Sequence, residues 1–170
     1  MTRAEQEAKT LLELGHSVVE RATSAGADVA EAGMHSGSHL SVKVRMGKPE
    51  LVEEAGSRAL GLRVMVGNRV ASTYTSDLSE AGKRTLIEDA LELARLSESD
   101  AFAGPPDPSE LSSPAQWQDL DAFDEAVSGI SADEALERAL QGERAAFEFD
   151  PRVSNSEGAS FTRARGVSAL

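Results

Sequence analysis

The residues of this sequence best suited to chemistry are three histidines, His16, His35 and His39. A catalytic zinc ion usually takes three protein ligands, often two histidines one helical turn apart with a glutamate as base. His35 and His39 are four residues apart, but the Ser-Gly-Ser run at 36–38 is typical of a turn and not of a helix. We therefore interpret them as loop histidines of a hairpin, and we keep a metal site that uses this pair as an alternative hypothesis.

Other reactive groups are equally sparse. The sequence has no cysteine, which excludes thiol catalysis and Cys-based metal sites, and it has no G-x-S-x-G elbow, Walker loop or G-x-G-x-x-G motif. Asp119, Asp121 and Asp124 crowd together, yet they lack the glycine and terminal glutamate of an EF-hand loop. We expect no catalytic, cofactor-binding or metal-binding residue in this chain.

The formal charge of −12 is concentrated in one segment. Residues 97–150 hold 14 Asp and Glu against two Arg, whereas the acids and bases of the other residues cancel. A nucleic-acid surface needs clustered Lys and Arg, so we exclude nucleic acid as a partner. The acidic segment is interpreted as a solvated surface or, alternatively, as a docking face for a basic partner.

The N-terminal residues are charged and contain no apolar h-region, and no run approaches the roughly 18 apolar residues that cross a bilayer. Together with the lack of cysteine, this predicts a cytoplasmic protein without a membrane association.

Residues 59–79 predict two strands joined by a tight turn. Leu62, Val64 and Val66 recur at the period of a strand, and Gly67-Asn68 fits a two-residue hairpin turn. Further strands are predicted at residues 28–34, 40–45, 50–55 and 152–162, with turns at 36–38 and 47–49 and a bend at Gly56.

Apolar residues at helical spacing predict helices over residues 3–25 and 80–96, and the capping box S-A-D-E at 131–134 opens a third helix. Residues 97–130 contain four prolines and predict a long acidic connection within the domain. The sequence thus predicts a single α+β (α/β) domain, with a mainly antiparallel mixed sheet of about five to six strands and three helices, in the order α-β-β-β-β-β-α-loop-α-β.

Basic and polar side chains occur at intervals along the predicted strands of this acidic chain. Such half-polar strands are typical of plain solvent-facing alternation, or of a sheet face or edge that meets a partner or an extended peptide. The candidate residues for contact with a peptide or partner are Arg63, Arg69, Tyr74 and Asn155.

Four stretches of the sequence resemble the PmbA (TldE) branch of the TldD/PmbA family, long described as modulators of DNA gyrase. They are G-A-D-V-A-E-A at 26–32, S-T-Y-T-S-D-L-S at 72–79, I-S-A-D-E-A at 130–135 and V-S-N-S-E-G-A-S-F at 153–161. Their order and their spread across nearly the whole chain make the resemblance specific.

The resemblance implies proteolysis of small or unfolded peptides by a TldD–TldE assembly, in which the TldD-type subunit carries an HExxxH zinc site. The PmbA/TldE-type subunit lacks those ligands, which also lie beyond the N-terminal domain, so no catalytic residue transfers to this sequence. The expected partners are a TldD-like catalytic subunit in a heterodimer, or a second copy in a homodimer, and a peptide substrate. Zinc is expected only in the catalytic partner.

By this resemblance residues 1–170 are the N-terminal α/β domain, and a larger, mostly β C-terminal domain is absent from the sequence. The first function hypothesis is therefore a non-catalytic subunit domain of a TldD/TldE-type zinc metalloprotease. The alternative is a stand-alone acidic interaction module without a link to proteolysis.

Overall fold

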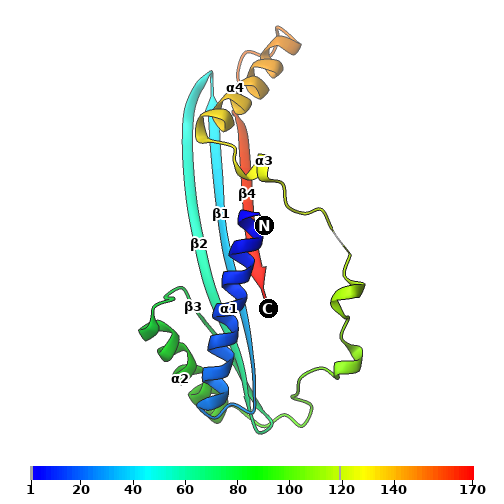
Figure 1. Ribbon diagram of the computed structural model, residues 1–170. Helices are drawn as coiled ribbons and strands as arrows, with labels where there is room; N and C mark the ends of the chain where they lie inside the picture. The colour runs from blue at the N-terminus through cyan, green and yellow to red at the C-terminus, as the bar shows by residue number, and fades with distance from the viewer. Residues whose placement is uncertain (1, 119) are drawn as a thin grey trace. The chain divides into compact units, whose positions relative to one another are not determined.

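The computed structural model describes residues 2–118 and 120–170, with the side chain of Pro114 excepted (Figure 1). Its elements, in chain order, are α1 Arg3–Ser24, β1 Val29–Arg45, β2 Lys48–Val66, β3 Arg69–Thr75, α2 Glu80–Leu96, two single 3₁₀ turns at Pro108–Glu110 and Pro114–Gln116, α3 Glu125–Ser128, α4 Ala132–Phe149 and β4 Ala159–Ala169. The predicted α+β class is confirmed, and the helix predicted over residues 80–96 has the bounds of α2.

The four strands of the described residues form one sheet in the order β3-β2-β1-β4. This count is lower than the five to six strands predicted, because β1 runs through residues 36–38 and β2 runs through Gly56 without a turn or bend. Ser36 is buried in this strand and its hydroxyl donates to a carboxylate oxygen of Glu7 at 2.6 Å. Pairing with neighbouring strands and packing under α1 therefore outweigh the local turn preference of Ser and Gly.

The predicted bounds of the C-terminal strand are also wrong. The strand predicted at 152–162 begins only at Ala159, and it continues beyond residue 162 through Arg165 and Gly166. Gly158, which precedes it, has φ +107, and a Cβ there would lie 2.2 Å from the carbonyl oxygen of Val44. Glycine at 158 thus lets the chain approach β1 closely before β4 starts.

Two tight turns set the strand order. Gly67 has φ +60 and opens the two-residue turn between β2 and β3, as the Gly-Asn pair predicted. Met46 and Gly47 form the turn between β1 and β2, and both have positive φ, 51 and 71. The carboxylate of Glu143, on α4, accepts the backbone N–H groups of Met46 and Gly47 at 2.9 and 2.8 Å.

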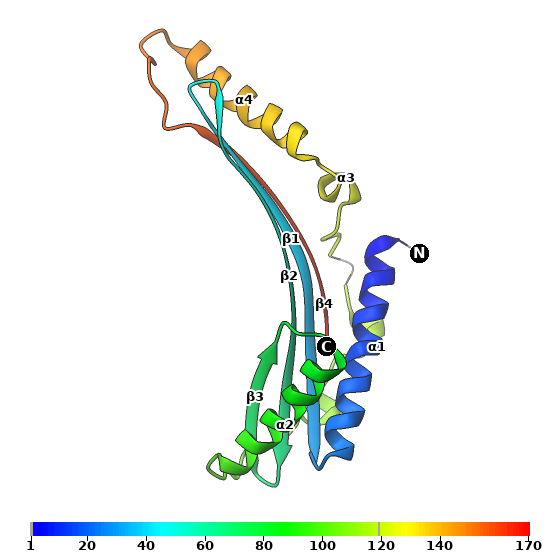
Figure 2. The same ribbon diagram turned by 90° about the vertical axis from the view of Figure 1, so that its left-hand side faces the viewer.

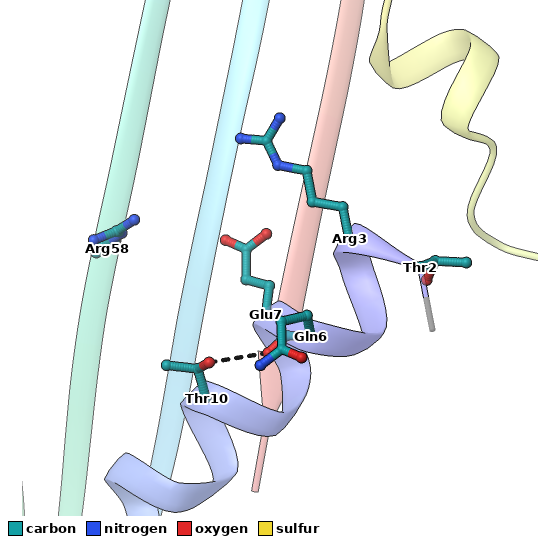
Figure 3. A pocket seen from close by; sticks show the side chains of 6 residues that line it. All are labelled: Thr2, Arg3, Gln6, Glu7, Thr10 and Arg58. Atoms are coloured by element: carbon teal, nitrogen blue, oxygen red, sulfur yellow. Dashed lines mark hydrogen bonds between the residues drawn. The ribbon is translucent and has the colours of Figure 1, made fainter.

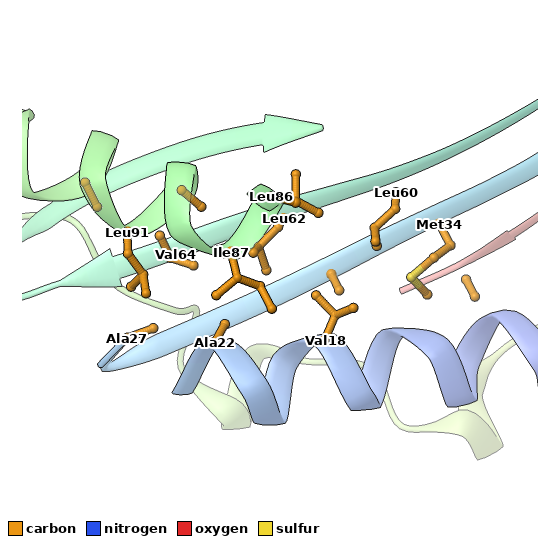
Figure 4. Close-up of a cluster of buried hydrophobic side chains, with 14 of the residues drawn as sticks. Val18, Ala22, Ala27, Met34, Leu60, Leu62, Val64, Leu86, Ile87 and Leu91 are labelled. Carbon is orange, nitrogen blue, oxygen red and sulfur yellow. The ribbon is translucent and has the colours of Figure 1, made fainter. Parts of the chain in front are cut away.

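The chain divides into two compact units. The first contains α1, β1 as far as Ser36, the segment Ser57–Gln118 and the end of β4, Val167–Leu170. Its core lies between the sheet and the helices α1 and α2 (Figure 4). The fully or nearly fully buried side chains at its centre include Val18 of α1, Leu60, Leu62 and Val64 of β2, and Ala90 and Ala94 of α2.

The second unit contains Gly37–Gly56 and the chain from residue 120 to Gly166. Its core is formed by Leu40, Val42 and Val44 of β1 beneath Ala135 and Ala139 of α4. The Ser131 capping box predicted from the sequence opens α4: the hydroxyl accepts the Glu134 N–H, and the Glu134 carboxylate accepts the Ser131 N–H at 2.8 Å. Arg138 of α4 also lies over the ring of Phe161, 5.2 Å from its centroid.

No helix in residues 2–118 and 120–170 has the length and apolar character that a membrane span requires.

Candidate partner-binding surface

The face of the sheet that points away from α1 and α2 in the first unit carries polar side chains. The register of β2 and β3 places Arg63 opposite Ser72 and Gly61 opposite Tyr74. Arg63 donates to the Glu31 carboxylate at 2.8 Å, and both side chains are about two-fifths exposed. Tyr74 is 81% exposed. The structure thus brings two of the predicted contact residues, Arg63 and Tyr74, onto one face.

A shallow hollow of about 250 Å³ lies on this face, beside the Arg63–Glu31 pair. Its floor is low because Gly33 and Gly61 lie side by side on β1 and β2: a Cβ at 61 would be 3.6 Å from the Gly33 carbonyl oxygen. Leu170 lies against it, with its side chain 3.2 Å from where a Cβ of Gly33 would be. The hollow combines an apolar floor with a charged rim, a combination typical of small contact sites.

Arg69 and Asn155, the other two predicted contact residues, lie elsewhere. Arg69 donates to the carbonyl oxygens of Arg95 and Ser97 at 3.0 and 2.7 Å. A cation at this position balances the negative end of the α2 dipole. Asn155 lies exposed in the loop before β4, in the second unit, where its side-chain oxygen accepts the Ser156 N–H at 3.0 Å. The contact role of all four residues stays a prediction.

The structure places the two histidines of the alternative metal hypothesis apart along one strand. His35 and His39 lie within one continuous strand, β1, and not on either side of a turn as predicted. Four residues of extended chain span about 13 Å, too far for two side chains to share one ion. His35 contacts the Ser168 hydroxyl at 3.0 Å, and His39 contacts the Glu53 carboxylate at 3.4 Å.

The structure places one member of the aspartate cluster of the connection, Asp124, at the start of a helix. Asp124 caps α3 by accepting the Ala126 N–H at 2.7 Å, and Asp119 lies outside the described residues. Across residues 2–118 and 120–170, no three His, Cys, Asp or Glu side chains come together in a way that could hold a metal ion. The side chains present therefore do not fit the zinc ion that the family resemblance implies for the assembly.

An open hollow of about 520 Å³ lies at the start of α1 (Figure 3). Arg3 and Arg58 line the hollow together with the acidic side chain of Glu7, so its charge is mixed and not purely basic. The Glu7 carboxylate also accepts a hydrogen bond from the Ser36 hydroxyl. Within it the Thr10 hydroxyl donates to the Gln6 carbonyl oxygen at 3.0 Å. Its lining residues are Thr2, Arg3, Gln6, Glu7, Thr10 and Arg58.

A groove of about 260 Å³ lies between β3 and α2, and the sequence did not predict it. Asp77 and Asp89 both line it, together with Thr73, Thr75 and Thr85. The Ser79 hydroxyl and N–H, the latter 2.9 Å from Asp77 Oδ1, hold the pKa of Asp77 below its ordinary value. The sequence signal at this place is the D-L-S run at 77–79, whose polar side chains are typical of the start of a helix.

Comparison with known proteins identifies the relatives of the chain. Residues 30–94 match the family model described as PmbA/TldA metallopeptidase domain 1. The chain is 36% identical over 167 residues, 98% of its length, to the metalloprotease PmbA of Escherichia coli O157:H7. It is 39% identical over 149 residues, 88% of its length, to a metalloprotease PmbA homologue of Haemophilus influenzae. The chain belongs to the TldD/PmbA family.

Solved structures of lower identity show the same fold as this TldD/PmbA chain. A Bacteroides thetaiotaomicron protein described as a candidate modulator of DNA gyrase superposes with a TM-score of 0.77 over 92% of the chain, at 21% identity. TldE from Thermococcus kodakarensis gives a TM-score of 0.69 over 91% of the chain, at 15% identity. The chain covers 35% and 37% of those two structures. It spans about a third of the curated relatives, 36% of the E. coli protein and 32% of the H. influenzae protein.

Proposed function

We propose that this chain is the N-terminal, non-catalytic part of a subunit in a TldD/TldE-type zinc metalloprotease that degrades or processes small or unfolded peptides. The observation that carries the proposal is the 36% identity to a metalloprotease PmbA over 98% of the chain. The catalytic zinc and its ligands are assigned to a TldD-like partner, as the resemblance to the family implies.

In this role the chain supplies shape and binding surface to the assembly. The outer face of the first unit offers the Arg63–Glu31 ion pair, the exposed ring of Tyr74 and the hollow over Gly33 and Gly61. Exposed aromatic and arginine side chains beside a small hollow are the residue types that dominate protein–protein contacts. We assign this face to contact with the catalytic subunit or with the peptide that it cleaves.

The test uses the purified chain, alone and mixed with a TldD-type subunit from the organism that encodes it. We expect the chain alone to cut no fluorogenic peptide and to hold far less than one zinc per chain by metal analysis. We expect sedimentation to show a complex with the TldD-type subunit, and Arg63→Ala to weaken that complex.

Two results would overturn the proposal. Peptide cleavage by the chain alone, with zinc bound stoichiometrically and lost in a His35→Ala or His39→Ala variant, would make this a metalloenzyme in its own right. A well-folded chain that shows no association with the TldD-type subunit would favour the acidic interaction module.

A further inference from the structure

β3 is an edge strand whose outer side is open. In the described part of the chain it pairs only with β2, and Figure 2 shows it outermost in the sheet with α2 beside it. Residues that flank a two-residue turn form a hydrogen-bonded pair, so Arg69, Ala71 and Thr73 direct their backbone groups towards β2. The alternate residues Val70 and Ser72, and Tyr74 after them, therefore present their N–H and C=O groups to the open side.

The open edge of β3 lacks the features that usually discourage strand pairing. Exposed edges are commonly protected by lysine, proline or bulges. The part of β2 that extends beyond β3, residues 48–59, has such protection in Pro49 and in five charged side chains. The run Val70–Thr75 has no proline and no charged residue, and the guanidinium of Arg69 is bound to the end of α2.

The groove between β3 and α2 runs beside this open edge and is acidic. Its lining includes the carboxylates of Asp77 and Asp89 and contains no Lys or Arg. Asp77 is held in place against the first turn of α2, where a Cβ on Gly82 would lie 2.4 Å from the Asp77 carbonyl oxygen. Glycine at 82 therefore allows the loop that carries this carboxylate to pack directly on the helix.

The two sides of the edge offer different chemistry. Side chains alternate between the faces of a strand, so a strand added to β3 would point every second residue towards the groove and the others towards the face that carries Tyr74. The groove side favours a cation because its carboxylates are negatively charged, and the Tyr74 side favours an apolar side chain that can pack on the exposed ring.

We propose that the open edge of β3 binds an extended peptide as an added strand, and that the groove beside it receives a Lys or Arg side chain of that peptide against Asp77 and Asp89. The recognised peptide alternates cationic and apolar residues. Main-chain hydrogen bonds supply affinity in such binding, and the pockets for alternate side chains supply specificity. The proposal concerns this chain alone, so it can fail while the protease assignment stands. Equally, the protease assignment can fail while the peptide-binding edge stands.

The test titrates the purified chain with a short acetylated and amidated peptide that has Lys at its centre and Val on both sides. The comparison peptide has norleucine in place of Lys. We expect the Lys peptide to bind about tenfold more tightly at low salt by calorimetry. In NMR spectra of the chain, we expect the amide signals of Val70, Ser72 and Tyr74 to shift most.

Variants of α2 separate the groove from the general negative charge of the chain. Asp89→Asn should remove most of the preference for Lys over norleucine. The control Glu92→Gln neutralises an exposed acid of the same helix that does not line the groove, and it should keep that preference. Thr85→Lys, which places a cation in the groove, should abolish Lys-peptide binding. An equal loss in Glu92→Gln and Asp89→Asn would overturn the assignment to the groove.

N-methylation of the peptide tests strand addition directly. Two versions of the Lys peptide carry N-methyl groups on alternate amides. In each version, only one of the two edges of the extended peptide can still donate hydrogen bonds. Pairing with β3 uses one edge only, so one version should lose binding and the other should keep it. If both versions bind equally well, the peptide does not add to the sheet and the proposal is wrong.

Discussion

Glu143 is a buried carboxylate whose role is to hold a turn. It is 3% exposed and accepts the N–H groups of Met46 and Gly47. The Gly47 amide, with smaller contributions from the Ser156 hydroxyl and the Met46 amide, keeps the pKa of Glu143 below its ordinary value of 4.5. Met46 has a positive φ, which is unfavourable for a residue with a Cβ, so the carboxylate stabilises a strained turn.

We expect Glu143→Gln to lower stability in a pH-dependent way. Because the pKa of Glu143 is lowered on folding, its stabilising effect is complete above pH 4.5, the ordinary value, and is lost as the pH falls through the folded value. The urea midpoints of variant and parent should therefore differ most at neutral pH and converge in acid. The control is Glu148→Gln, an exposed acid of the same helix. A gap that is unchanged by acidification would contradict this account.

The register of β2 and β3 explains how far the candidate site could be predicted. Alternation in the sequence correctly placed Arg63 and Tyr74 on strands, and the turn at Gly67 determines that they share a face. The groove could not be predicted, because Asp77 and Asp89 come together only when α2 packs beside β3. The role of Arg69 at the end of α2 depends on that same packing.

At the scale of elements, helices were easier to predict than strands. The ends of α1, α2 and α4 are marked by local signals, such as Gly26 after α1 and the Ser131 capping box before α4. The length of β1 depends on partners distant in sequence. Ser36 is buried in β1, where its hydroxyl donates to the carboxylate of Glu7 on α1. No local pattern in the Ser-Gly-Ser run carries that information.

The capping box of α4 gives a prediction at this scale. Ser131→Ala removes the hydroxyl that accepts the Glu134 N–H and should lower the free energy of unfolding by about 1 kcal/mol. The measurement is chemical denaturation followed by circular dichroism. Ser154→Ala, at an exposed position in the loop after α4, should change stability by less than about 0.5 kcal/mol. Equal effects of the two substitutions would show that the cap does not stabilise α4.

At the scale of the whole molecule, the two hydrophobic clusters share one sheet but are covered by different helices. Leu62 belongs to the cluster under α1 and α2, whereas Leu40 belongs to the cluster under α4. Regions of a protein can open with different free energies, according to the contacts that each region makes. The clusters therefore provide separate measures of local stability.

Truncation of each cluster should affect its own helix most. Leu62→Ala and Leu40→Ala remove fully or nearly fully buried side chains and should each cost about 2–5 kcal/mol. Hydrogen exchange should accelerate mainly in α2 for Leu62→Ala and mainly in α4 for Leu40→Ala. Leu96→Ala, at a position 75% exposed, is the control and should leave both helices protected. Equal acceleration of α2 and α4 in either variant would mean that the chain opens as one cooperative unit.

The long hairpin of β1 and β2 has a consequence for how the chain folds. Sliding one strand along the other by a single residue would turn every side chain to the wrong side and expose Leu40, Val42 and Val44 to water, where they promote aggregation. At the end of the hairpin away from its turn, the Asp28 carboxylate accepts the N–H of Gly67 at 2.6 Å, and the Asp28 N–H donates to the carbonyl oxygen of Met65. Glu143, 97 residues after Met46, can lock the turn only once α4 has been made. During synthesis both partners of the contacts at the Asp28 end are therefore present well before the carboxylate that holds the turn.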